Sequence, residues 1–166
     1  MKILRFTCCL FVLLLSLGAF AFFSSAHASG GGGGGVGNCV ESGVTVCSIT
    51  VASTGQLVAR TTVLISATVT CTVPTGFTFQ NGFADVSITQ ASGRQINQGF
   101  GGSSLTTCDG TVQTFQVGVT PQAGSPPFHG GSATATGALV VNFLDSSGNS
   151  IQEQAFTGPQ VIHIRG

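Results

Sequence analysis

Strict alternation of apolar and polar side chains constrains this chain more than any other feature of its sequence. Between Thr62 and Val73, apolar residues occupy every odd position, and from Ser66 onward serine and threonine fill the even ones. A period of two places one set of side chains on each face of an extended strand, whereas a helix needs a period of about 3.6. The segment therefore predicts a half-buried strand of an antiparallel sheet that directs Cys71 into the core.

The same alternation recurs in residues 84–89, 115–120 and 133–143, with Gly-, Pro-, Asn- and Ser-rich turn signals between the runs. No stretch of ten residues shows the stripe of an amphipathic helix. These patterns predict an all-β domain, namely an immunoglobulin-like antiparallel β-sandwich of about seven to nine strands with two disulfides. The apolar parity changes around Cys47, which predicts a β-bulge or a strand that switches sheets there.

Residues 1–28 have the organisation of a secretory signal peptide. Two basic residues precede an apolar run from Phe6 to Phe23, and a small-x-small cleavage site ends at Ala28. We therefore expect cleavage after Ala28 and a secreted, extracellular protein, with association to the cell surface as one option. An uncleaved membrane anchor is the alternative, because the apolar run is nearly long enough to span a bilayer.

Residues 29–37 are almost entirely glycine, which predicts a flexible linker ahead of a single immunoglobulin-like domain at 38–166. Cleavage after Ala26 is also compatible with the small-x-small rule and would make His27 the N-terminal residue. An N-terminal amine and imidazole can chelate copper, but the glycine tract offers no fixed second histidine. We therefore expect no copper site.

Four cysteines remain after the predicted cleavage, and an even number in an exported chain predicts two disulfides. Three pairings are open, and we favour Cys39–Cys47 with Cys71–Cys108. The first closes a short loop, and the second joins a strand to a turn 37 positions later. On the loop-entropy model the second disulfide stabilises the fold by about 4 kcal/mol. No CxxC or paired Cys/His spacing indicates zinc, so no metal is expected.

The chain that follows the predicted signal carries little charge. It has three arginines and no lysine against five acids, a net charge of −2. Without a basic patch, neither nucleic acid nor anionic lipid is an expected partner, and no membrane association is expected after cleavage. A neutral surface of Thr, Ser, Gln and Gly repels other copies only weakly, so we expect self-association.

Candidate catalytic residues are scarce. His129 lies in a Pro- and Gly-rich loop, and His163 alternates with isoleucines and should face solvent. Asp109 and Asp145 stand in turn sequences, where aspartate bonds the nearby backbone. Because no nucleophile elbow, zinc-protease motif or phosphate loop is present, we predict no catalytic residue, no cofactor and no enzymatic activity.

Phenylalanine supplies every aromatic side chain, since tryptophan and tyrosine are absent. Phe100 lies within Gly99–Gly102, which suggests a flexible loop, and Phe128 follows two prolines. We predict that these two residues are exposed contacts for a partner. Loop phenylalanines can also fold back over the ends of a sandwich, and that alternative stays open.

Three motifs resemble the small secreted immunoglobulin-like proteins of Gram-positive and related soil bacteria, within roughly residues 56–140: Thr70–Pro74, Val86–Gln90, and Thr107–Thr111 leading to Val117–Pro121. In that family a strand cysteine pairs with the cysteine of a later Cys-Asp-Gly turn, which implies a Cys71–Cys108 bond. Most members are uncharacterised, so the resemblance implies a fold and a compartment but no activity.

The sequence thus predicts a secreted, non-enzymatic immunoglobulin-like module with a surface, matrix or protein-interaction role. Its partner would be an extracellular protein or a surface component that the residues do not identify. The main alternative is an extracellular small-ligand-binding protein with an apolar cleft between the sheets, and a secreted hydrolase or copper protein is a third hypothesis.

Overall fold

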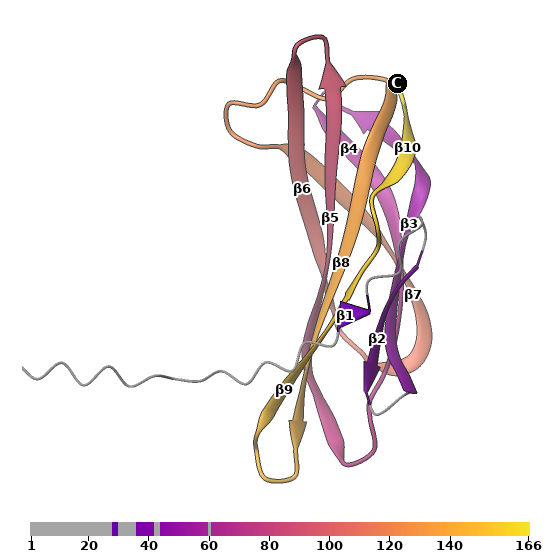
Figure 1. The fold of residues 1–166 in the computed structure, drawn as a ribbon, viewed down its shortest axis with the longest axis vertical. Coiled ribbons are helices and arrows are strands. Elements are labelled where there is room, and N and C mark those ends of the chain that lie inside the picture. Colours follow the sequence, from indigo (N-terminus) through magenta and orange to yellow (C-terminus); the bar gives the residue numbers. More distant parts are fainter. Residues whose placement is uncertain (1–27, 30–35, 42–43, 60) are drawn as a thin grey trace, which may run out of the picture.

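The computed structural model describes residues 28–29, 36–41, 44–59 and 61–166 (Figure 1). Within these ranges the regular structure is all β, with no helix. The described residues form ten strands: β1 (Ala28–Ser29), β2 (Val36–Glu41), β3 (Val44–Val58), β4 (Thr62–Thr72), β5 (Phe77–Ser92), β6 (Gln95–Leu105), β7 (Asp109–Pro121), β8 (Gly131–Asp145), β9 (Ser150–Phe156) and β10 (Gln160–Arg165).

These strands form one sheet that closes on itself. In the order β3–β10–β8–β5–β6–β7–β4 each strand pairs with the next, and β4 pairs back with β3. Strand β10 runs parallel to β3, whereas the other pairings are antiparallel. The all-β prediction is confirmed, but the seven strands form a closed barrel, where the sequence predicted the separate sheets of an immunoglobulin-like sandwich.

The barrel closes through strand pairings on two opposite sides of this elongated molecule (Figure 1). One layer contains β6–β5–β8–β9 and the other β7–β4–β3–β2. On one side β10 joins β8 to β3, and on the other β6 meets β7 through only two residue pairs, Gly99–Pro121 and Phe100–Thr120. Closure on this second side therefore depends on a short contact.

Glycines allow β6 to approach β7 that closely. A Cβ atom at Gly99 would overlap the carbonyl oxygen of Thr120, and one at Gly101 would overlap that of Gly118. No side chain fits between backbones at such a separation, so only glycine is compatible with the crossing. The segment 99–102 is therefore the middle of a strand, and the prediction of a flexible loop there is wrong.

The predicted alternation is confirmed where it was clearest. In β4 the odd residues from Val63 to Cys71 are buried, while the even residues face outward and are at least partly exposed. Of the two alternatives predicted near Cys47, a β-bulge or a strand that switches sheets, the structure has the bulge, since the register between β2 and β3 shifts after the Cys39–Cys47 pair. Because of that extra residue, the adjacent Val46 and Cys47 are both buried.

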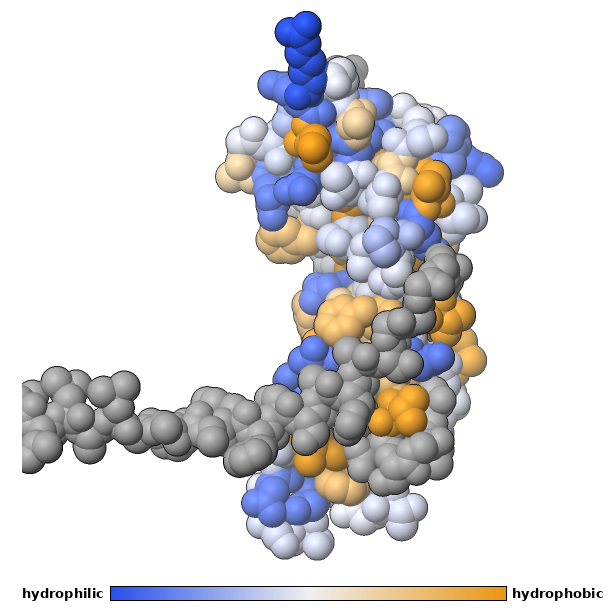
Figure 2. Space-filling model, in the orientation of Figure 1, coloured by the Kyte–Doolittle hydropathy of each residue, from blue (hydrophilic) through white to orange (hydrophobic). Residues whose placement is uncertain are grey.

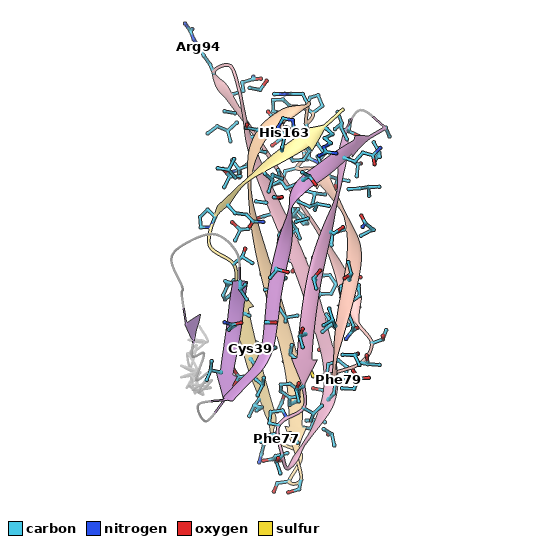
Figure 3. All side chains as sticks on the ribbon, turned by 90° about the vertical axis from the view of Figure 1, so that its right-hand side faces the viewer. Cys39, Phe77, Phe79, Arg94 and His163 are labelled. Atoms are coloured by element: carbon cyan, nitrogen blue, oxygen red, sulfur yellow. A yellow bond between two sulfur atoms is a disulfide. The ribbon has the colours of Figure 1, made fainter. Side chains whose placement is uncertain are left out.

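Two clusters of buried side chains fill the interior. The first contains the four disulfide cysteines and Phe143, with Phe77 and Phe79 packed against it, toward the lower end in Figure 3. The second is formed mainly by aliphatic residues of β4, β5, β7, β8 and β10. Phe115 packs against both clusters and so links the two halves of the core.

The favoured disulfide pairing is confirmed. Cys39–Cys47 joins β2 to β3 with a Cα–Cα distance of 5.1 Å, and Cys71–Cys108 joins β4 to the residue before β7 with a distance of 4.7 Å. All four cysteines are buried. Two structural disulfides are typical of proteins that fold in an oxidising compartment.

The predicted signal peptide and linker fall mostly outside the described residues. Ala28 and Ser29 form β1, which pairs with β2. Strand β2 begins at Val36, two residues before the domain start at 38 that the sequence predicted. The cleavage site and the secretory route stay predictions.

Candidate functional site

The structure describes two histidines, His129 and His163. His163 is exposed on β10 (Figure 3), and His129 is exposed in the loop before β8, where its Nδ1 lies 2.9 Å from the carbonyl oxygen of Gly130. Within the described ranges, no three His, Cys, Asp or Glu side chains are grouped as metal ligands would be. The sequence predictions of no metal, no cofactor and no catalysis stay predictions.

Two aspartates hold turns, as the sequence predicted. Asp145 Oδ1 accepts hydrogen bonds from the backbone N–H groups of Ser147 and Asn149, both at 2.8 Å. Asp109 Oδ1 accepts from the Thr111 backbone at 3.0 Å and from its hydroxyl at 2.6 Å. These hydrogen bonds favour the ionised carboxylates and lower the pKa of both groups. Their role is structural.

The expectation that Phe128 is exposed is wrong, since its side chain is 2% exposed and belongs to the second core cluster. Two buried amides hold its loop against the strands. Gln90 Nε2 donates to the His129 carbonyl at 2.8 Å and Gln90 Oε1 accepts from the His129 N–H at 3.0 Å, while Asn97 donates to another loop carbonyl at 2.8 Å. The Phe128 ring lies over Gly99, where a Cβ would be 2.9 Å from it. This loop therefore folds back over the end of the strands.

Phe100 is exposed, but on a strand and not in a loop. It is 61% exposed on the outward surface of β6, and Phe83 of β5 and Phe156 of β9 are 43% and 42% exposed. We call the outward surface around Phe83, Asp85, Phe100 and Phe156 the aromatic face. Figure 2 shows the molecule hollowed at mid-height on the side where β5 and β6 run in Figure 1, with apolar residues bordering the hollow.

Strand register gathers these side chains around Asp85. Asp85 pairs with Gly102 of β6, and Phe156 lies in the same cross-strand row, two strands away on β9. Phe83 precedes Asp85 by two residues on the same face of β5, and Phe100 precedes Gly102 by two residues on β6. Neighbouring strands lie about 4.8 Å apart, and successive same-face residues about 7 Å apart. Three aromatic rings and one carboxylate therefore occupy one continuous patch.

Asp85 is the charged residue of the aromatic face. A Cβ placed on Gly102 would overlap Oδ1 of Asp85 and lie 2.6 Å from Cε1 of Phe83. The carboxylate and the ring thus share the space above this glycine. Asp85 makes no hydrogen bond or ion pair with any described residue, and its partial burial raises the pKa of its carboxyl group.

A chain of four amide side chains borders the aromatic face across β9, β8 and β5. Gln154 donates to Gln152 at 2.8 Å, Gln152 to Asn142 at 3.1 Å, and Asn142 to Asn81 at 2.7 Å. Gln154 lies in the same cross-strand row as Phe83, and Asn81 precedes Phe83 by two residues on β5. The chain forms an uncharged polar rim beside the apolar patch.

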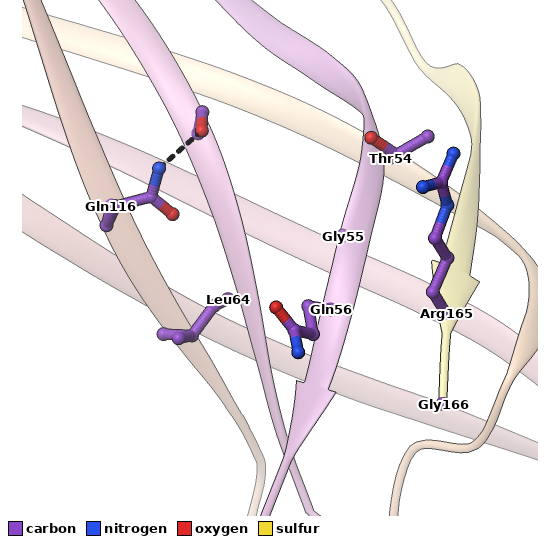
Figure 4. A pocket seen from close by; sticks show the side chains of 8 residues that line it. Thr54, Gly55, Gln56, Leu64, Gln116, Arg165 and Gly166 are labelled. Carbon is purple, nitrogen blue, oxygen red and sulfur yellow. Dashed lines mark hydrogen bonds between the residues drawn. The ribbon is translucent and has the colours of Figure 1, made fainter.

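A pocket of about 450 Å³ lies on another part of the surface, over β3, β4, β7 and β10 (Figure 4). Its lining is mainly polar and includes Thr54, Gln56 and Gln116 besides Leu64, and Arg165 stands on one side. Gln116 donates to the Ser66 hydroxyl at 2.6 Å, which holds the amide in place. The pocket is shallow and open, unlike an apolar cleft between two sheets.

Of the aromatic face, the sequence predicted a contact role for Phe100 but not for Phe83, Asp85 and Phe156. The alternation over 84–88 already placed Asp85 opposite the buried residues of its strand, and Phe83 shares the parity of Asp85. That signal locates two side chains on one strand face. It does not show which strands lie beside β5, so the grouping could not be predicted.

None of the described residues belongs to a helix long and apolar enough to cross a membrane. Comparison with known proteins finds no match for the chain among protein-family models, curated proteins or solved structures.

Proposed function

We propose that this protein is a secreted, non-enzymatic module that binds another extracellular protein or a surface component through its aromatic face. The observation that carries the proposal is the exposure of Phe83, Phe100 and Phe156, between 42% and 61%, on one continuous sheet surface. Contiguous exposed apolar patches on soluble proteins mark interaction sites, and aromatic residues are enriched in protein interfaces.

The proposal includes an extracellular location and an immunoglobulin-like fold. One observation supports each of these two parts. The buried disulfides suit an oxidising compartment, in agreement with the predicted signal peptide. The layers β6–β5–β8–β9 and β7–β4–β3–β2 face each other as the sheets of a sandwich do. Binding of an apolar ligand between the layers has less support, since the two core clusters occupy the interior.

A comparison of two exposed-residue variants tests the role of the aromatic face. Beads carrying the purified protein are incubated with secreted and surface proteins of the source organism, and retained proteins are identified by mass spectrometry. We expect a component that wild type retains and Phe100→Thr loses. Val112→Thr is the matched control, because Val112 is 68% exposed on β7, in the other layer, and should retain the component.

Equal retention by the two variants would contradict binding through the aromatic face. If the retained component is the protein itself, the face mediates the self-association that the low charge predicts. A sedimentation experiment with wild type and Phe100→Thr would then show association in wild type alone.

A further inference from the structure

We propose that the aromatic face recognises an arginine side chain of a partner protein, with the guanidinium group against Asp85 and its flat surface against the phenylalanine rings. This inference rests on the proposed function, because it names the chemistry of the partner at the same surface.

Asp85 has no counter-ion among the residues that the structure describes. This carboxylate is partly buried, yet it makes no hydrogen bond or ion pair with a described residue. The two arginines that the structure describes lie elsewhere: Arg94 projects from the tip of the β5–β6 hairpin (Figure 3), and Arg165 borders the polar pocket (Figure 4). Partial desolvation without a partner among the described residues disfavours the ionised carboxylate, so a cation from a bound partner would relieve that cost.

The Asp85 carboxylate lies among aromatic rings. Asp85 and the Phe83 ring both lie over Gly102, as the overlap with a Cβ placed there shows. Phe100 follows on the neighbouring strand, and Phe156 lies in the same row as Asp85. Aromatic faces attract cations through their quadrupole, so the rings and the carboxylate favour the same kind of ligand.

The surroundings of Asp85 favour arginine over lysine. Guanidinium is planar, weakly hydrated and able to stack on a ring while it donates hydrogen bonds in its plane. Ammonium is compact and strongly hydrated, and it loses more hydration on an apolar surface. The aromatic face is apolar around one carboxylate and is bordered by amides, which suits the less hydrated cation. The net charge of −2 predicted for the exported chain also favours a basic partner.

Nuclear magnetic resonance with small probes tests this inference on the protein purified from culture medium. N-acetyl-arginine methylamide is titrated while the phenylalanine ring signals are recorded, and N-acetyl-citrulline methylamide serves as the neutral isostere. We expect saturable shifts of the Phe83 and Phe100 signals with the arginine probe. Binding of the citrulline probe should be about fivefold weaker, which is the upper end of the range for one partly solvated charge pair.

Two variants identify the responsible carboxylate. Asp85→Asn keeps the side-chain size and should weaken the arginine probe about fivefold. Asp109→Asn removes an equal charge at a distant turn, where asparagine can still hold the turn, and should leave binding unchanged. The ring signals of each free variant report whether it is folded.

The results that would contradict arginine recognition differ from the result that would contradict the proposed function. Equal shifts with both probes, or equal weakening by the two variants, would overturn arginine recognition, while an interaction lost in Phe100→Thr would still support the aromatic face. Absence of any saturable shift would likewise overturn the arginine inference. Only equal retention by Phe100→Thr and Val112→Thr contradicts the proposed function itself.

Discussion

The substitution Gly101→Ala is expected to open the side of the barrel where β6 meets β7. The added methyl group would overlap the carbonyl oxygen of Gly118 and lie 2.8 Å from its carbonyl carbon and 3.2 Å from the Cα of Val119. All three neighbours are backbone atoms of a paired strand, so none can move away as the end of a flexible side chain could. Relief requires β6 and β7 to separate.

The expected cost follows from that separation. Overpacking of a filled interior typically costs about 1–3 kcal/mol. Displacement of β6 also threatens the short pairing at Gly99–Pro121 and Phe100–Thr120, where each lost hydrogen bond costs about 0.5–1.5 kcal/mol. We expect Gly101→Ala to lower the free energy of unfolding by about 3 kcal/mol. For a domain of this size that corresponds to a decrease in Tm of roughly 12 °C.

Gly118→Ala is the matched control, because it adds the same methyl group to the strand that Gly101 contacts. Its Cβ would lie 3.6 Å from the Thr62 side chain and 3.7 Å from that of Leu64, which are ordinary contacts. The control should be neutral or stabilising by about 0.4–1 kcal/mol, since alanine restricts the unfolded chain. Thermal and urea unfolding followed by circular dichroism measure both variants. Equal stabilities would refute the close crossing of β6 and β7.

Three further predictions concern the core, the disulfides and pH. Phe128→Ala should lower the free energy of unfolding by about 3–5 kcal/mol, because Phe128 is buried, and Phe100→Thr should lower it by less than about 0.5 kcal/mol, because Phe100 is exposed. Urea titrations measure both variants, and similar losses would contradict this difference in burial. Joint replacement of Cys71 and Cys108 by alanine should lower the free energy of unfolding by about 4 kcal/mol. Removal of the Cys39–Cys47 disulfide, which closes a shorter loop, should lower it by about 2.5 kcal/mol. Calorimetry measures both variants, and the reverse order would contradict the loop-entropy model. Burial raises the pKa of Asp85, so its ionised form destabilises the fold at neutral pH and this effect disappears as the carboxyl is protonated. Asp85→Asn should therefore raise Tm at about pH 7 and leave it nearly unchanged at about pH 2.5; the same gain at both values would show that charge is not the cause.

Structural features that depend on residues close together in the sequence were predictable. The alternation in Thr62–Thr72 identified β4 and its buried face. The parity change near Cys47 predicted a bulge or a strand that switches sheets, and the bulge is present. The turn roles of Asp109 and Asp145 followed from short-range aspartate chemistry. Each of these rests on contacts along one strand, within one turn or across one hairpin, where residue type limits the backbone directly.

Features that depend on strand neighbours were not predictable in the same way. Glycines in a row suggest a flexible loop unless another backbone is known to pass beside them, as β7 does at Gly101. Phe128 follows two prolines and suggests an exposed loop, yet Gln90 and Asn97 from distant strands hold that loop over the core. In both cases the deciding partner lies far away in sequence.

By itself, the sequence determined the all-β class, the buried parity of the strands and the chemistry of the turns, because alternation and turn propensity act within a few residues. Its cysteine content also limited the disulfides to three pairings, of which the favoured one is present. Only the tertiary structure decided that the layers close into a barrel and that Phe83, Phe100 and Phe156 surround Asp85 on one face. That grouping arises from the pairing of β5 with β6 and β8, and of β8 with β9, and long-range register is set by packing of the whole core.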